Sequence, residues 1–205
     1  MGQGNAAVVQ TPDGRTILID GGGFSGRSGF DTGRFIVGPF LWRHWILTLD
    51  AIILTHPQSD HMNGLVFIMD NFKVQNWIHN KDKNNTLAFK ALTDLTQRKN
   101  IPEFFPSDRC LAVEFNRVCF TLMPDQNRIF PGDLNNNSLA FRLRFKNFSM
   151  FFPGDVEFER EMYLVRDQNI SLASRILLAP HHGSQSSSSK IFLDKVRPQR
   201  VIISC

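Results

Sequence analysis

The feature that most constrains the fold is an apolar run that ends in histidine and aspartate side chains. Ala51-Ile52-Ile53-Leu54 predicts a buried strand, and Thr55-His56-Pro57-Gln58-Ser59-Asp60-His61 follows it directly. Imidazole and carboxylate groups are ligands that suit zinc, manganese and iron. The pattern therefore favours a metal site formed by His56, Asp60 and His61, and the alternative is a polar turn or helix N-terminus without a metal.

Two further strand-like runs end in the same chemistry. Asp155 closes Phe151-Phe152-Pro153-Gly154-Asp155, and the pair His181-His182 follows the apolar run of residues 176–179. The alternatives are a helix N-cap for Asp155 and a solvated loop for the histidine pair. Three strand ends that carry histidine or aspartate make a metal-dependent hydrolase the leading hypothesis.

Asp20 ends a fourth strand-like run and has a different candidate role. It lies in Ile19-Asp20-Gly21-Gly22, where a carboxylate often belongs to a turn. A carboxylate can also accept a hydrogen bond from a ligating histidine and thereby orient it. Both interpretations of Asp20 stay open from the sequence.

Composition sets limits on the class of protein. The chain has 205 residues, which suits one domain or two fused halves, and a net charge of +4 mildly favours an anionic partner such as nucleic acid. Its three cysteines lack CxxC spacing, which argues against a disulfide framework and a zinc–thiolate site. No run of 18 apolar residues occurs, so we expect a chain that is soluble as given.

Both ends of the sequence fall within predicted strands, at residues 6–10 and 201–205. We therefore expect a fragment of a longer protein. Its location is open between the soluble domain of an inner-membrane protein and the cytoplasm.

Periodicity predicts hairpins that alternate with helices, and hence two sheets covered by helices. The expected strands are 6–11, 16–20, 49–55, 74–78, 117–123, 138–145, 149–152, 176–179 and 201–204. The expected helices are 63–71, 86–99, 157–167 and 188–196. Residues 21–39 are rich in glycine and show no clear period, so we expect a long loop there.

Taken together, these motifs resemble the metallo-β-lactamase superfamily, whose fold is an α+β, αββα four-layer sandwich. Within it they resemble the C-terminal domain of ComEC, the DNA-uptake channel of competent bacteria, over nearly the whole chain, 1–205, as one domain. The matching pieces are Met1–Ala6, Leu18–Gly22, Leu54–Pro57, Asp60-His61, Asn136–Leu139, Pro153–Asp155 and Pro180–Ser184.

The resemblance implies roles for the donor residues. His56 would serve a first divalent ion, Asp60 and His61 a second, and Asp155 would bridge the two. One of His181 and His182 would complete the second site, with a slight preference for His181. Asp60 and Asp155 would also handle protons during hydrolysis. The implied ions are zinc or manganese, one or two in number.

The chain departs from the family pattern at the first ion. Gln58 stands where related chains carry histidine or aspartate, and its amide oxygen is a weaker, neutral ligand. Asn136-Asn137-Ser138 stands where a further histidine is usual, so Asn137 is at best a weak or outer ligand. Asn5 likewise replaces the aspartate that the family often has. We expect a well-formed second site and a weak first site.

The resemblance implies a DNA nuclease linked to DNA uptake, with DNA as partner and a membrane channel region elsewhere in the full-length protein. Arg27, Arg34 and Ser184 are candidates for substrate contacts. Two other functions stay open. One is an impaired, non-catalytic domain that binds metal and DNA, and the other is a hydrolase of esters, thioesters or lactams whose apolar pocket comes from the phenylalanines between Phe24 and Phe40.

Overall fold

The computed structural model describes residues 4–24, 29–105, 111–115, 117–123, 130–168 and 170–204, and only the backbone of 111–115. The chain divides into two compact units, Met1–Phe105 and Pro106–Ser204. Each unit is a sheet with helices, and each contributes a different group of the candidate donors. Arg27, one of the predicted substrate contacts, lies outside the described residues.

The first unit contains a five-stranded sheet in the order β1-β2-β4-β6-β7. The strands are β1 (Ala7–Gln10), β2 (Thr16–Ile19), β4 (Ala51–Leu54), β6 (Trp77–His79) and β7 (Glu103–Phe104), and β3 (Thr48–Leu49) pairs separately with β5 (Lys73–Val74). β1 and β2 form an antiparallel hairpin, whereas β2, β4, β6 and β7 run parallel. The carboxyl ends of four strands therefore meet at one edge of this sheet.

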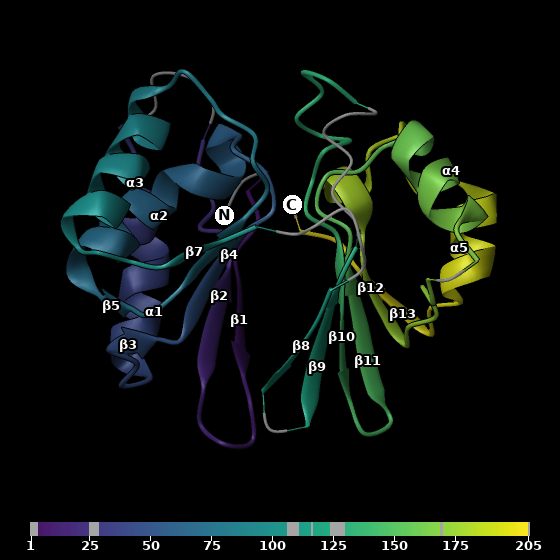
Figure 1. Cartoon of the computed structure of the whole chain (residues 1–205), viewed down its shortest axis with the longest axis horizontal. Helices are drawn as coiled ribbons and strands as arrows, with labels where there is room; N and C mark the ends of the chain where they lie inside the picture. The colour runs from purple at the N-terminus through teal and green to yellow at the C-terminus, as the bar shows by residue number, and fades with distance from the viewer. Residues whose placement is uncertain are drawn as a thin grey trace. The chain divides into compact units, whose positions relative to one another are not determined.

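Helices cover one face of this sheet (Figure 1). They are the π-helix η1 (Gly33–Val37), α1 (Gly38–Arg43), α2 (Ser59–Asn71) and α3 (Leu87–Arg98). Leu18, Ile52, Leu65 and Leu92 pack between helices and strands, all fully buried. Thr86 caps α3 by accepting a hydrogen bond from the backbone N–H of Phe89, as expected for a threonine at this position.

The expectation of a long loop over residues 21–39 is wrong in its second half, which is helical from Gly33 onward. The glycines there serve close packing. A Cβ atom on Gly33 would lie 2.0 Å from the carbonyl oxygen of Gly64, and one on Gly64 would lie 2.1 Å from that of Gly21. The sequence cannot distinguish glycine used for close approach from glycine used for a turn.

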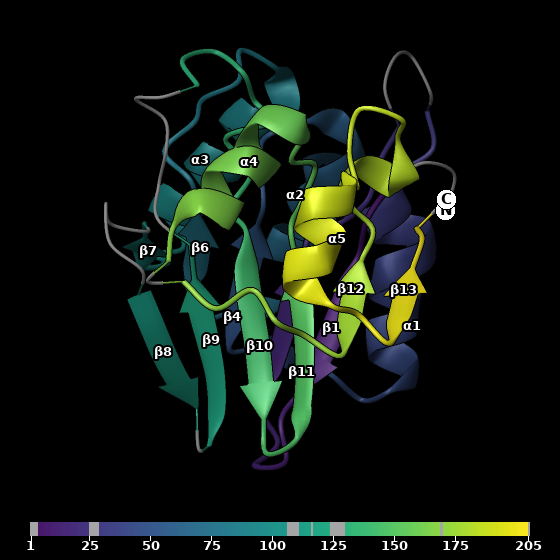
Figure 2. The same cartoon turned by 90° about the vertical axis from the view of Figure 1, so that its right-hand side faces the viewer.

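The second unit contains a six-stranded sheet in the order β13-β12-β11-β10-β9-β8. The strands are β8 (Leu111–Phe115), β9 (Val118–Leu122), β10 (Phe141–Phe145), β11 (Phe148–Phe152), β12 (Ile176–Leu178) and β13 (Arg200–Ile202). β8 to β11 are antiparallel neighbours, and β11, β12 and β13 run parallel. Helices α4 (Phe158–Arg166) and α5 (Lys190–Val196) lie on one face of this sheet (Figure 2).

The predicted helices after residues 86, 157 and 188 all form, whereas α2 begins at Ser59 instead of the expected Asn63. The predicted strands 49–55 and 74–78 each divide, the first into β3 and β4 and the second into β5 and β6. β8 and the helices η1 and α1 were not predicted, and neither was β7, whose two residues are too few for a period. Within the described residues, no helix is both long and apolar enough to cross a membrane.

Candidate metal centre

In the first unit, the end of β4 and the first turn of α2 hold three predicted donors. His56 follows β4 and is fully buried, and its ring centroid lies 4.2 Å from that of His61. Asp60 and His61 are neighbours in the first turn of α2. His61 is fully buried, whereas the Asp60 side chain is 24% exposed, and its Oδ2 lies 3.9 Å from His61 Nε2. The helix start thus puts a carboxylate and an imidazole within reach of one another.

Asp20 organises both histidines of this unit. Its carboxylate accepts hydrogen bonds from the backbone N–H of Thr55 at 2.8 Å and from the Thr55 hydroxyl at 2.9 Å. Its Oδ2 also lies 2.8 Å from His61 Nδ1, so the Nδ1–H of His61 donates to it. The Thr55 hydroxyl donates its only proton to Asp20. It therefore accepts a hydrogen bond from His56 Nδ1, which lies 3.1 Å away.

These contacts determine which nitrogen of each histidine carries the proton and which carries the lone pair. Both His56 and His61 carry their proton on Nδ1, so both present an Nε2 lone pair. A buried carboxylate behind the imidazole is the usual outer partner of a metal-ligating histidine. Asp20 itself is 2% exposed and has a φ of 53°, a left-handed conformation that aspartate tolerates better than most residues.

Backbone hydrogen bonds fix the strand ends to the start of α2. Gly21 N–H donates to the His61 carbonyl at 2.7 Å, and Asn5 N–H donates to the Asp60 carbonyl at 3.1 Å. Asn5 is buried, at 5% exposure. The backbone that carries the donor residues of this unit is therefore held by hydrogen bonds to neighbouring segments.

In the second unit, Asp155 follows β11 and is 1% exposed. Its backbone N–H donates to Ser138 Oγ at 3.0 Å, and the N–H of Glu157 donates to Asn136 Oδ1 at 2.9 Å. Asn137 is buried, and its amide nitrogen donates to the Phe130 carbonyl at 2.8 Å. The segment Asn136–Ser138 thus holds the loop that carries Asp155.

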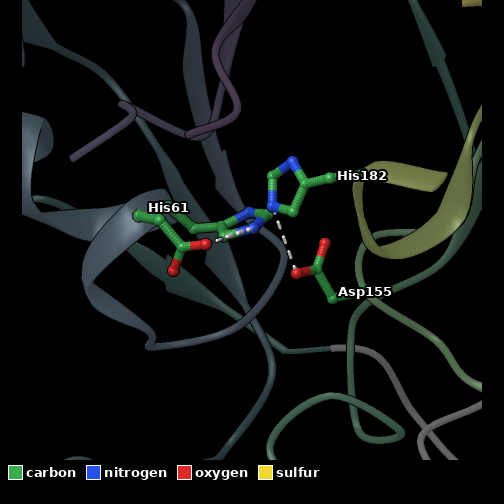
Figure 3. Close-up of side chains that lie close together, drawn as sticks. His61, Asp155 and His182 are labelled. Carbon is green, nitrogen blue, oxygen red and sulfur yellow. Dashed lines mark ion pairs between the residues drawn. The ribbon is translucent and has the colours of Figure 1, made fainter. Parts of the chain in front are cut away.

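His182 and His181 point to different partners in this unit. His182 Nδ1 lies 3.1 Å from the Ser204 carbonyl, so it carries the proton and leaves a lone pair on Nε2. That Nε2 lies 3.4 Å from Asp155 Oδ2 (Figure 3). A lone pair facing a carboxylate oxygen is repulsive unless a proton or a metal cation lies between them. His181 Nδ1 instead lies 2.9 Å from Glu157 Oε1.

His182, and not the His181 that the sequence-based preference favours, is the histidine that faces Asp155, and the choice of ligand between them stays a prediction. Both residues have left-handed backbones, with φ of 46° and 55°. Such strain is uncommon for histidine and gathers at functional sites. Adjacent residues in this conformation aim their side chains apart, which the sequence alone does not reveal.

The donor chemistry fits a divalent ion. Among the described residues, the candidate metal donors are Asp60 and His61 in the first unit and Asp155 and His182 in the second. Each unit thus offers one carboxylate and one imidazole, ligand types that suit zinc, manganese or iron. His56 offers a further Nε2 in the first unit.

The remaining candidate residues have ordinary local roles. Gln58 is the N-cap residue of α2, and its side chain makes no capping hydrogen bond. Arg34 is exposed, and its guanidinium lies 5.6 Å from the ring centroid of Phe35. Ser184 Oγ lies 3.0 Å from Ser186 Oγ in a serine-rich turn. None of these contacts tests a role in substrate binding.

The sequence analysis missed Thr55, Glu157 and Ser138 as supports of the donors. The position of Thr55 in the sequence could have indicated its role, because it directly follows β4 and precedes His56. No local pattern could have indicated the roles of Glu157 and Ser138, since these depend on neighbours 24 and 17 residues away in the chain.

Comparison with known proteins identifies the family. The model of the metallo-beta-lactamase superfamily matches residues 1–205. ComE operon protein 3 of Bacillus subtilis is 27% identical over 222 residues, which cover 100% of this chain and 27% of that protein. Competence protein ComA of Neisseria gonorrhoeae is 27% identical over 206 residues, which cover 99% of this chain and 26% of that protein. The chain spans about a quarter of the length of these relatives.

Solved structures agree on the fold. CmlA, a diiron beta-hydroxylase from Streptomyces venezuelae, matches with a TM-score of 0.63 and 16% identity over 96% of this chain and 42% of that one. A diphosphatase from the PhnP family matches with a TM-score of 0.51 and 16% identity over 96% of this chain and 70% of that one. At such identities the likeness shows the fold alone. The chain belongs to the metallo-β-lactamase superfamily.

Proposed function

We propose that this chain hydrolyses phosphodiester bonds of DNA with the help of divalent metal ions, for which Asp60 and His61 of the first unit and Asp155 and His182 of the second are the candidate ligands. The observation that carries the proposal is the fixed tautomer of each histidine. Asp20 accepts a hydrogen bond from His61 Nδ1 and the Ser204 carbonyl accepts one from His182 Nδ1, so in each ring the lone pair is on Nε2, the nitrogen that can bind a metal. The approach of His182 Nε2 to the Asp155 carboxylate requires a proton or a cation between them, and a metal cation is the choice that the proposal makes.

A divalent ion bound there would supply Lewis acidity to a phosphoryl oxygen and make water a stronger nucleophile. The chain supplies the proton handling and the orientation. Asp60 is the most exposed of the four donors, at 24% of its side chain, so its Oδ2 is placed to accept a proton from an attacking water. Asp155 is held by the Ser138 hydroxyl through its backbone and keeps its carboxylate in one position.

DNA is the proposed substrate for two reasons. One relative is named Competence protein ComA, and another, from Haemophilus influenzae, is named Recombination protein 2. The net charge of +4 also favours a polyanion. Because fold alone does not establish chemistry, the assignment depends on the donor residues and needs a direct assay.

The test is a titration of the purified chain with Mn²⁺ and Zn²⁺ in the presence of labelled single-stranded and double-stranded DNA. We expect metal-dependent cleavage that Asp60→Ala reduces by at least about 100-fold, as is typical of a lost general base. Asp70→Ala is the matched control, because Asp70 lies in the same helix but is exposed and pairs with Arg98 at 3.0 Å. Cleavage that survives Asp60→Ala, or that needs no metal, would contradict the proposal.

A second candidate function is an impaired domain that binds metal and DNA without cleaving it. Gln58 favours it, because an amide replaces a charged or imidazole ligand at the position next to the donors. Metal-dependent binding with intact DNA in every metal would support this alternative.

A third candidate is hydrolysis of esters, thioesters or lactams. The first unit has an apolar groove of about 220 Å³ lined by Ala6, Val8, Leu18, Ile36, Val37 and Phe40. Such a volume lies below the range typical of small-molecule sites, and no metal donor lines it. Turnover of a generic ester together with inertness toward DNA would favour this candidate.

A further inference from the structure

The edge of the first sheet that carries the metal donors continues into an aromatic cluster. β2, β4, β6 and β7 are parallel neighbours, and their carboxyl ends lead to Asp20, His56, Asn80 and Phe105 in turn. Leu54 pairs with His79, and Ile78 pairs with Phe104, so these strand ends are in register. β7 is therefore two strand spacings from β4, or about 10 Å.

The cluster is built from stacked rings. His79 stacks on the buried Trp77 with centroids 4.2 Å apart and an interplanar angle of 24°. Phe105 meets His79 edge-on, with centroids 4.7 Å apart and an angle of 70°. Phe104 and Phe105 remain 52% and 40% exposed. Phe105 thus exposes part of its ring to solvent on a support of buried rings, and the neighbouring Phe104 is exposed as well.

A basic loop lies against this cluster. Lys81 and Lys83 are exposed, and Lys81 Nζ lies 5.9 Å from the ring centroid of Phe105. Asn84 donates from its amide to the Pro57 carbonyl at 2.6 Å, which fixes the loop beside the residue that follows His56. The loop therefore links Phe105, through Lys81, to the residue that follows His56, through Asn84.

The acidic groups nearby each have a partner, although Glu103 is itself exposed. Glu103 Oε2 lies 3.2 Å from His79 Nε2, and burial lowers the pKa of His79, which leaves it neutral near pH 7. The backbone N–H of Asp82 donates to Asn80 Oδ1 at 3.3 Å, and Asp82 is half-buried. The lysines are thus the more exposed charges of this loop.

We propose that Phe104 and Phe105, with Lys81 and Lys83, form a subsite that stacks a nucleobase of single-stranded nucleic acid while the lysines contact its phosphates. The proposal deepens the proposed function and rests on it. Exposed aromatic rings bind bases through their faces, and adjacent cations bind the backbone. A duplex offers no free base face, so the subsite selects single strands about one or two nucleotides from the metal donors, given the 10 Å spacing.

The experiment measures binding without cleavage. Fluorescence anisotropy in EDTA compares a labelled oligothymidine with an abasic strand of equal length, for the wild type and for the double variant Phe104→Ser with Phe105→Leu. Leucine preserves an apolar contact with His79. We expect the double variant to lose about 5- to 150-fold in affinity for oligothymidine, and to bind the abasic strand unchanged.

Two controls distinguish base stacking from electrostatic attraction and from non-specific hydrophobic binding. Lys81→Ala with Lys83→Ala should weaken both strands alike and reduce the slope of affinity against salt by about 0.7 for each lost phosphate contact. Trp45→Ser should change nothing. Trp45 is 89% exposed in the same unit, but it precedes β4 and so lies toward the amino ends of the parallel strands.

The outcomes are distinguishable from those of the proposed function. Phe-dependent binding without cleavage in any metal would retain the subsite and overturn the nuclease. Cleavage with unchanged binding in the double phenylalanine variant would overturn the subsite, and would leave β7 as an edge for another polypeptide. Equal losses for the thymidine and abasic strands, tighter binding of duplex, or no binding by the wild type would overturn it as well.

Discussion

The two units hold their candidate donors in different ways. In the first unit, a buried carboxylate does the positioning: Asp20 bonds directly to His61 and, through the Thr55 hydroxyl, to His56. In the second unit, backbone does the positioning: His182 is oriented by the Ser204 carbonyl and by its own left-handed conformation. Side chains support one group of donors, and chain geometry supports the other.

This difference determines which substitutions are informative. A positioning side chain can be changed without touching the donor it supports, so Asp20 and Thr55 give clean tests in the first unit. A positioning carbonyl cannot be removed by substitution. In the second unit the donors themselves must be exchanged, with residues that tolerate a positive φ.

The largest expected effect distinguishes the two adjacent histidines. His182→Asn should lower metal affinity by more than the roughly 10- to 100-fold that loss of an outer partner costs, because it removes a donor. His181→Asn should leave affinity within about 3-fold, since Glu157 is its partner at 2.9 Å. Asparagine tolerates the left-handed backbone at both positions, so the pair is matched.

Isothermal titration with Mn²⁺ and Zn²⁺ measures both affinities. A larger loss in His181→Asn than in His182→Asn would reverse the assignment and restore the preference drawn from the sequence.

The next effect tests the carboxylate support of the first unit. Asp20→Asn keeps a residue that accepts a φ of 53° but removes the charge that holds two histidines, so metal affinity should fall about 10- to 100-fold. Thr55→Val removes the hydroxyl that connects Asp20 to His56 but leaves the direct contact of Asp20 with His61, so it should cost less. Titration with Mn²⁺ alongside thermal unfolding separates metal loss from misfolding. Equal affinities for Asp20→Asn and the wild type would show that backbone suffices here too.

A gain of function is expected from restoring the missing ligand. Gln58→Asp supplies the charged oxygen that the first ion lacks, and should raise the affinity for that ion by about 10-fold, or increase the bound stoichiometry. Gln58 is the N-cap of α2 and makes no capping bond, so aspartate there also stabilises the helix. Gln58→Asn is the control, because it caps equally well but adds no charge. A similar change in metal binding for both variants would mean that helix stability is the cause.

The sequence indicates the candidate donors more directly than the residues that support them. Strand ends followed by histidine and aspartate were visible as local patterns, and the family model confirms the fold they suggested. The start of α2 was placed too late, since Pro57 and Gln58 read as loop residues while Ser59 already belongs to the first turn. Helix N-termini with polar residues leave no hydrophobic period to detect.

Other features depended on contacts between distant residues. Asp20 and His61 are 41 residues apart, and only pairing of β2 with β4 brings them together. The choice between His181 and His182 depends on two consecutive left-handed residues, which no propensity indicates. β7 has two residues, too few for any period, although it carries one of the exposed phenylalanines of the proposed subsite.

The smallest expected effect concerns His79, which makes the first unit sensitive to acid. Burial lowers the pKa of His79 from 6.5, while Glu103 opposes the shift. The unfolded chain therefore binds this proton more readily than the folded chain, so stability is full above about pH 6.5 and falls as pH decreases through that value. His79→Gln should remove this part of the pH dependence, although loss of the Trp77 stacking lowers stability by about 0.5–1.5 kcal/mol at every pH. Urea unfolding at a series of pH values measures the difference between variant and wild type. A difference that stays constant from pH 7.5 to pH 5 would mean that the Glu103 contact compensates burial in full, and that the strand edge beside the donors does not sense pH through this histidine.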